Sequence, residues 1–142
     1  PNITRLISPD QLKWKHLLTP EVSIPTKWDK KMYDQWRIEL GDLYREQSQE
    51  IKNMKAEGKS EDKIAKVKNK YSKKIKTLRE KTADFIKNHP LKSTVGAFEG
   101  AGYSSEGIYR PMLNCLMISN QEKKFCIVCQ DAIQRMIDYY TR

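Results

Sequence analysis

Two long stretches of the chain carry apolar residues at helical spacing. Between residues 29 and 58, and again between residues 60 and 88, apolar side chains recur every three or four positions, which is the period of one face of an α-helix. Only Glu57, Gly58 and Lys59 separate the two stretches. The pattern therefore predicts an antiparallel pair of helices joined by a short turn. The apolar positions are Met32, Trp36, Leu40, Leu43, Ile51 and Met54 in the first stretch, and Ile64, Val67, Tyr71, Ile75, Leu78, Phe85 and Ile86 in the second.

The segments on either side of this hairpin follow other patterns. Residues 1–28 contain four prolines, three of them (Pro9, Pro20 and Pro25) among short apolar clusters, and proline lacks a backbone donor and restricts the residue before it. We expect an extended, winding segment that packs on the rest of the protein, because Trp14 and Trp28 need burial. Helical spacing returns over residues 126–142 and predicts one closing helix. Its expected apolar face holds Ala132, Ile133, Met136, Ile137 and Tyr140.

The stretch from Gly96 to Cys129 is too rich in glycine for a helix. It holds four of the six glycines and all three cysteines, with aromatic and charged residues between them. Glycine allows positive φ and a close approach of the backbone to other groups, so this composition is typical of a functional site built on a loop. The chain is thus organised as a connecting segment (residues 1–28), a helical hairpin (29–88), and a cleft loop with a closing helix (89–142).

Composition and charge narrow the class of protein. The 142 residues suit one domain, but 38% hydrophobic and 32% charged residues favour long solvent-exposed helices. The net charge is +9, and residues 51–81 hold twelve Lys or Arg against four Asp or Glu. Such a hairpin could bind nucleic acid. Because arginine is scarce and aromatic residues are not interleaved, we interpret it as a solvated face and do not expect nucleic acid as a partner.

A family resemblance rests on a long motif in the glycine-rich stretch. Residues 98–117 are F-E-G-A-G-Y-S-S-E-G-I-Y-R-P-x-x-N-C-x-M, and F-C-x-V-C-x-x-A-I follows from residue 125. This sequence resembles the C-terminal signature of the immunoglobulin A peptidase family of zinc metallopeptidases. Residues 13–16 (K-W-K-H) and 24–26 (I-P-T) resemble the connecting segment of that family. The resemblance skips residues 27–94, which we interpret as an insertion.

The resemblance implies the C-terminal portion of an α+β metzincin-like catalytic domain, mostly α in this chain. In such enzymes an H-E-x-x-H helix binds zinc, which activates a water for peptide hydrolysis, and a Met-turn lies beneath the metal. This chain has no H-E-x-x-H, and its histidines, His16 and His89, are far apart. We therefore expect no catalytic residue and no bound metal in this chain alone. The zinc helix is expected in an upstream part of the same protein.

The resemblance also assigns candidate roles to residues of the motif. Met117 is the candidate Met-turn residue, against the alternative of an ordinary core methionine. Tyr103, Tyr109 and Arg110 are candidates for the substrate cleft, since a hydroxyl can donate to an oxyanion and a guanidinium can hold a carboxylate. The alternative is that Tyr103 and Tyr109 anchor the loop by burying their rings, and that Arg110 pairs with Glu99 or Glu106. For Glu99 and Glu106 we expect only hydrogen bonds to the loop's own amides.

The three cysteines leave several possibilities open. Cys115, Cys126 and Cys129 could form a structural zinc site, but a fourth ligand is missing. A redox C-x-x-C is not supported, because no β-α-β context surrounds it. We prefer a disulfide from Cys115 to Cys126 or Cys129, a pairing that the sequence does not decide. A disulfide would agree with a secreted, periplasmic or cell-surface protein.

Two functions remain. The first is the C-terminal part of a zinc endopeptidase that acts on a protein or peptide substrate. The second is a non-catalytic module whose basic hairpin contacts an acidic partner. No apolar run approaches the length of a membrane span. Because the chain opens on Pro1 without a leader, we expect it to be a mature or cut piece.

Overall fold

The computed structural model describes residues 2–5, 8–119 and 122–141. It is mostly helical, with one small two-stranded antiparallel sheet. The chain divides into two compact units, one of Pro1–Lys30 with Ile86–Arg142 and the other of Lys31–Phe85. None of the described helices is both long and apolar enough to cross a membrane.

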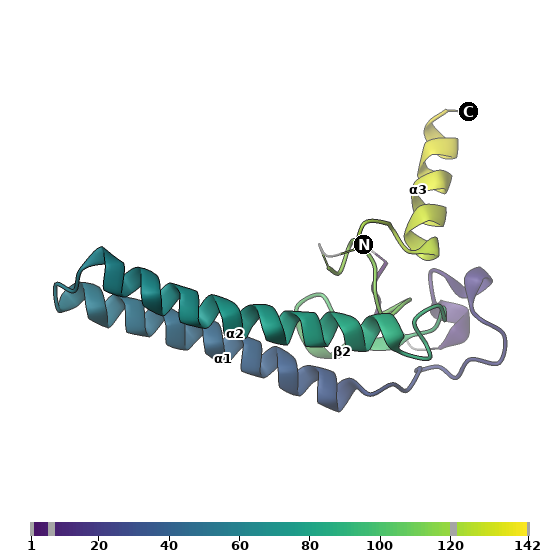
Figure 1. Cartoon of the computed structure of the whole chain (residues 1–142). Coiled ribbons are helices and arrows are strands. Elements are labelled where there is room, and N and C mark those ends of the chain that lie inside the picture. Colours follow the sequence, from purple (N-terminus) through teal and green to yellow (C-terminus); the bar gives the residue numbers. More distant parts are fainter. Residues whose placement is uncertain (1, 6–7, 120–121, 142) are drawn as a thin grey trace. The chain divides into compact units, whose positions relative to one another are not determined.

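The second unit is a pair of long helices, α1 (Lys30–Ala56) and α2 (Glu61–Asn88), which run side by side in Figure 1. Tyr71 donates a hydrogen bond from its hydroxyl to Glu50 Oε2 at 2.9 Å, and the rings of Trp36 and Phe85 meet edge to face at 5.3 Å. A late residue of α1 thus contacts the first half of α2, and an early residue of α1 contacts the end of α2, so the two helices are antiparallel. The two helices follow the predicted stretches. Their buried apolar side chains lie on α2: Ile64, Tyr71, Ile75, Leu78 and Ile86.

Gly58 ends α1 in the way its sequence predicts. Its φ is +65°, the left-handed conformation that glycine adopts without a steric penalty. The N–H of Lys59 donates to Met54 O at 3.0 Å, and that of Gly58 donates to Lys55 O at 3.1 Å. This pair of bonds is a Schellman motif, which satisfies carbonyls that the helix end would otherwise leave unpaired.

The first unit is built around a small apolar core. Trp14 is 1% exposed and packs with Leu12, Val95, Ala97 and Val128. The N-terminal segment reaches this core through two short 3-10 turns, η1 (Pro9–Gln11) and η2 (Lys15–Leu17). The closing helix α3 (Ile127–Tyr140) supplies only its first turn, where Val128 and Cys129 are buried. Of the apolar face expected on this helix, Met136, Ile137 and Tyr140 are exposed.

Within the glycine-rich stretch, residues 98–110 form a β-hairpin rather than the loop predicted from the composition. Strand β1 (Phe98–Ala101) pairs antiparallel with β2 (Ser104–Arg110). Gly102 and Tyr103 connect the strands with φ values of 58° and 67°. Positive φ at both central residues is the signature of a type I′ turn, whose twist matches that of the two strands. Gly100, with φ at +102°, lies at the irregularity in the pairing between Glu99 and Ala101.

Candidate functional site

The connecting segment and the start of the glycine-rich stretch, the two regions that carry the family resemblance, lie against each other. The bonded residues are 71 and 82 positions apart in the chain. Trp14 donates from Nε1 to Gly96 O at 2.7 Å, inside the core. Thr26 exchanges hydrogen bonds with Ala97: its backbone N–H donates to Ala97 O, and its Oγ1 accepts from Ala97 N, both at 2.9 Å. The connecting segment thus supports the start of the β-hairpin directly.

Tyr103 and Tyr109 take different positions on the hairpin. Tyr103 lies in the type I′ turn with its side chain fully exposed. Tyr109 is partly buried against the core, and its backbone N–H and C=O both bond to Thr4, at 2.8 and 3.0 Å. The structure therefore places Tyr109 as an anchor of the N-terminal segment and Tyr103 at the tip of the hairpin.

Arg110 lies at the opposite end of the hairpin from Tyr103. Its side chain is almost fully buried, and Nη1 donates to Gly100 O at 2.7 Å. Its guanidinium stands over the ring of Trp28, 5.2 Å from the ring centre, a cation–π contact. The described contacts of Arg110 are thus structural. The hairpin does not bring the three candidate cleft residues together, and their role toward a substrate stays a prediction.

Glu99 bonds the hairpin's own backbone, as predicted. Its Oε1 accepts from Gly107 N at 3.0 Å, and its Oε2 lies 3.9 Å from Lys30 Nζ. The Glu99 side chain therefore links β1 to β2 and places its other oxygen near Lys30.

Met117 lies in a tight turn after the hairpin. Cys115 O accepts from the backbone N–H groups of Ile118 and Ser119, at 2.8 and 3.0 Å. The Met117 side chain is 60% exposed, with Leu116 and Ile118 also exposed on either side. Met117 is therefore not a core methionine within this chain.

The turn of Met117 and the start of α3 bring the three cysteines together. All three are free thiols, and their Sγ atoms lie within 4.8 Å of one another. Cys115 Sγ and Cys129 Sγ are 3.7 Å apart, and Cys126 donates from its backbone N to Cys115 Sγ at 3.1 Å. A disulfide between Cys115 and either partner stays a prediction.

These surroundings separate the acidities of the three thiols. Burial raises the pKa of Cys115, but hydrogen bonds from the backbone N–H groups of Cys126 and Met117 outweigh it, and the pKa lies below its usual value. Burial raises the pKa of Cys126 to about 12 and also raises the pKa of Cys129. Cys115 is therefore the thiol that ionises first.

Comparison with known proteins identifies the family of the chain. The family model of IgA Peptidase M64 matches residues 1–137. The chain belongs to the IgA peptidase M64 family. The match confirms the resemblance drawn from the glycine-rich motif. The interpretation of the helical hairpin as an insertion stays a prediction. No curated protein and no solved structure matches it.

The histidines of this IgA peptidase family member do not form the zinc site that its family implies. His16 Nε2 lies 3.1 Å from Asp131 Oδ2 and also contacts Arg135. His89 is buried, accepts from Leu91 N at 3.1 Å through Nδ1, and stands 3.3 Å from Asp29 Oδ2. The described residues therefore do not fit a histidine-bound catalytic zinc.

Sequence reasoning missed the contact between His16 and the closing helix. Arg135 pairs with Asp131 one turn away on α3, and this bond, followed by the bond from His16, holds the pKa of the Asp131 carboxyl below its usual value. The spacing of Asp131 and Arg135 signals their pairing on a helix, but no local signal could connect them to a residue 115 positions earlier.

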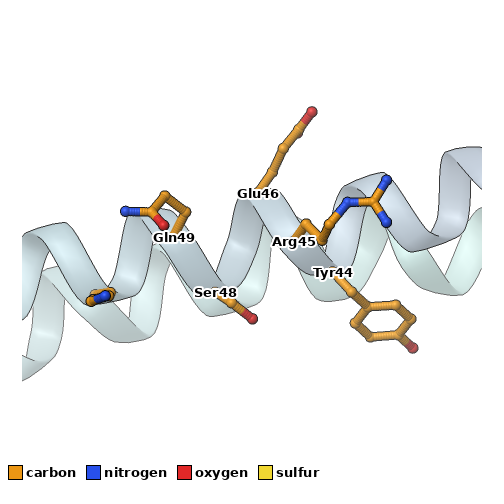
Figure 2. A pocket seen from close by; sticks show the side chains of 6 residues that line it. Tyr44, Arg45, Glu46, Ser48 and Gln49 are labelled. Atoms are coloured by element: carbon orange, nitrogen blue, oxygen red, sulfur yellow. The ribbon is translucent and has the colours of Figure 1, made fainter.

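A hollow on the surface of α1 offers no binding site. Its lining comes from one stretch of that helix, and Figure 2 shows Tyr44, Glu46 and Gln49 pointing in different directions. Ligand sites enclose a molecule between convergent groups, and no groups converge here.

Proposed function

We propose that the chain is the C-terminal part of a zinc-dependent endopeptidase whose H-E-x-x-H helix lies outside these 142 residues. The family match over residues 1–137 carries this proposal. The chain contains neither an H-E-x-x-H sequence nor a second histidine four residues from either of its own. Two histidines one turn apart are what a zinc-binding helix needs.

In this proposal the chain supplies the floor and one wall of the cleft. The turn of Met117 is the Met-turn, and the exposure of Leu116, Met117 and Ile118 supports an arrangement in which another part of the protein covers them. The β-hairpin forms the wall, with Tyr103 at its exposed tip. Protein or peptide is the substrate class, and a secreted, periplasmic or surface location is proposed with it.

The test compares the product of the whole reading frame with the 142-residue chain. We expect an H-E-x-x-H upstream of Pro1, hydrolysis of a casein-type substrate by the whole protein, loss of that activity with a chelator, and recovery with zinc. A variant with glutamine at the motif's glutamate serves as the matched inactive control. Hydrolysis by the 142 residues alone, or a reading frame that lacks the motif, would contradict the proposal.

A second candidate function rests on the charge of the helical hairpin. Twelve basic against four acidic residues over residues 51–81 give it a strongly positive surface, which favours an acidic partner. Under this alternative the chain is a non-catalytic binding module. Salt-sensitive binding of the 142 residues to polyglutamate, lost when lysines of α2 are changed to glutamine, would support it if the whole protein has no peptidase activity.

A further inference from the structure

The cysteine cluster holds three sulfurs in one place without joining them. Cys115 comes from the turn of Met117, Cys126 is the N-cap of α3, and Cys129 lies in the first turn of that helix. Among the described residues, it is the one group of three or more cysteine, histidine or acidic side chains whose ligand atoms lie close enough to share an ion. Cys115 and Cys129 are buried and Cys126 is partly buried.

The spacing of the sulfurs suits a shared metal ion. A disulfide requires about 2.05 Å between two sulfurs, and it would leave the third cysteine unused. Two thiolates on a tetrahedral zinc, each about 2.3 Å from the metal, lie about 3.8 Å apart. Cys115 Sγ and Cys129 Sγ are 3.7 Å apart.

Hydrogen-bond donors surround the sulfurs as they do in metal–thiolate sites. The backbone N of Cys126 donates to Cys115 Sγ at 3.1 Å, and Asn2 Nδ2 donates to Cys129 Sγ at 3.4 Å. Cys126 is also the N-cap of α3, where the helix dipole favours negative charge. Donors to the sulfurs stabilise thiolates and orient ligands around a metal.

We propose that Cys115, Cys126 and Cys129 bind one Zn²⁺ ion as three thiolates. On binding, three S–H bonds break, three S–Zn bonds form, and three protons pass to the solvent. Three soft sulfur donors favour zinc over the hard cations Mg²⁺ and Ca²⁺. The fourth position is taken by water or by a group other than His16 and His89, whose rings are engaged elsewhere.

This ion would tie the turn of Met117 to the closing helix. The bridged residues, Cys115 and Cys129, are 14 positions apart, and metal binding that exists only in the folded state stabilises that state. The inference differs from the sequence-based expectation of a disulfide and of no metal in this chain. It does not rest on the proposed peptidase function.

The test uses the 142-residue chain, purified with reductant and zinc. We expect one zinc per chain by elemental analysis, and, after exchange with Co²⁺, the thiolate charge-transfer band and the intense visible bands of a tetrahedral site. Cys126→Ser should lose both signals. His16→Gln and His89→Gln are the matched controls and should keep the metal.

A second measurement needs no variant and so does not depend on whether a cysteine variant folds. In the zinc-loaded protein, all three thiols should resist alkylation and become reactive together when a chelator removes the metal. Chain that binds no zinc under these conditions, whether its thiols are reactive or two of them are joined in a disulfide, overturns the proposal. Preferential retention of copper, or zinc content that survives the loss of all three cysteines, overturns it as well.

Discussion

Thr26 lies directly over Gly96 in the core of the first unit. A β-carbon built on Gly96 would stand 2.3 Å from Thr26 Oγ1. That hydroxyl cannot simply turn aside, because it donates to Ser23 O at 2.8 Å and accepts from Ala97 N at 2.9 Å. Gly96 therefore approaches the connecting segment so closely that no β-carbon fits there.

Gly96→Ala should destabilise the first unit. Overpacking of a fixed contact costs about 1–3 kcal/mol of unfolding free energy, and a lower urea midpoint followed by tryptophan fluorescence would show it. Gly41→Ala is the matched control: Gly41 lies inside α1, where an added methyl meets only the end of the Arg45 side chain at 3.7 Å. The control should gain about 0.5–1 kcal/mol from helix propensity. Equal midpoints for Gly96→Ala and the wild type would contradict the packing described above.

Tyr103→Gly should leave the chain as stable as the wild type or more stable. Tyr103 adopts a φ of 67° and is fully exposed. The left-handed conformation costs a residue other than glycine about 1–2 kcal/mol, and glycine removes this cost. Glycine also makes the unfolded chain more flexible, which offsets part of the gain in folding free energy. Ser105→Gly, at an exposed position within β2, is the control and should lower the midpoint.

The same variant separates the two interpretations of Tyr103. In the whole protein, a Tyr103→Gly enzyme that is stable but has reduced kcat/KM would support a role in the substrate cleft. Unchanged kinetics would show that the tyrosine serves only as a turn residue.

Arg110→Lys should weaken the first unit by about 1–3 kcal/mol, because a lysine cannot both donate to Gly100 O and stack a planar cation on Trp28. The control is Arg79→Lys, at an exposed position of α2, which should change stability by less than about 0.5 kcal/mol. Thermal unfolding of the 142-residue chain measures both. An Arg110→Lys chain of normal stability, combined with a raised KM in the whole protein, would contradict a purely structural role and support the predicted role of this arginine in the substrate cleft.

The helices could be predicted from the sequence because their signals are local. Apolar spacing, the Gly58 cap and the short connection together specify α1 and α2 within a few residues. The β-hairpin could not be predicted in the same way, because its glycines argue against a helix but carry no local signal for strand pairing. Their function lies in the pairing: Gly102 forms the turn and Gly100 the irregularity in β1.

The site could be predicted only in part, for a related reason. The motif residues were recognised, but burial decides what they do, and burial depends on contacts far apart in the chain. Arg110 needs Trp28, 82 positions earlier, before its role can be assigned. Likewise, the sequence brings Cys115 to the C-x-x-C pair but does not decide whether it bonds one of the two sulfurs or shares an ion with both, and the three Sγ atoms lie within 4.8 Å of one another.

Replacing residues 31–85 with a short glycine–serine linker should leave the first unit folded. Both ends of that segment return to neighbouring points of the first unit: Asp29 lies 3.3 Å from His89, and Trp28 packs edge to face on the same imidazole. Because the core residues around Trp14 all lie outside the replaced segment, their burial does not depend on it. We expect a cooperative thermal transition and protection of the Trp14 indole N–H from hydrogen exchange.

As a control, Trp14→Phe in the shortened chain should lower the temperature of that transition, since the carbonyl of Gly96 loses its buried donor at a cost of about 1–3 kcal/mol. A shortened chain that lacks any cooperative transition would show that the helical hairpin is part of the core and not an insertion.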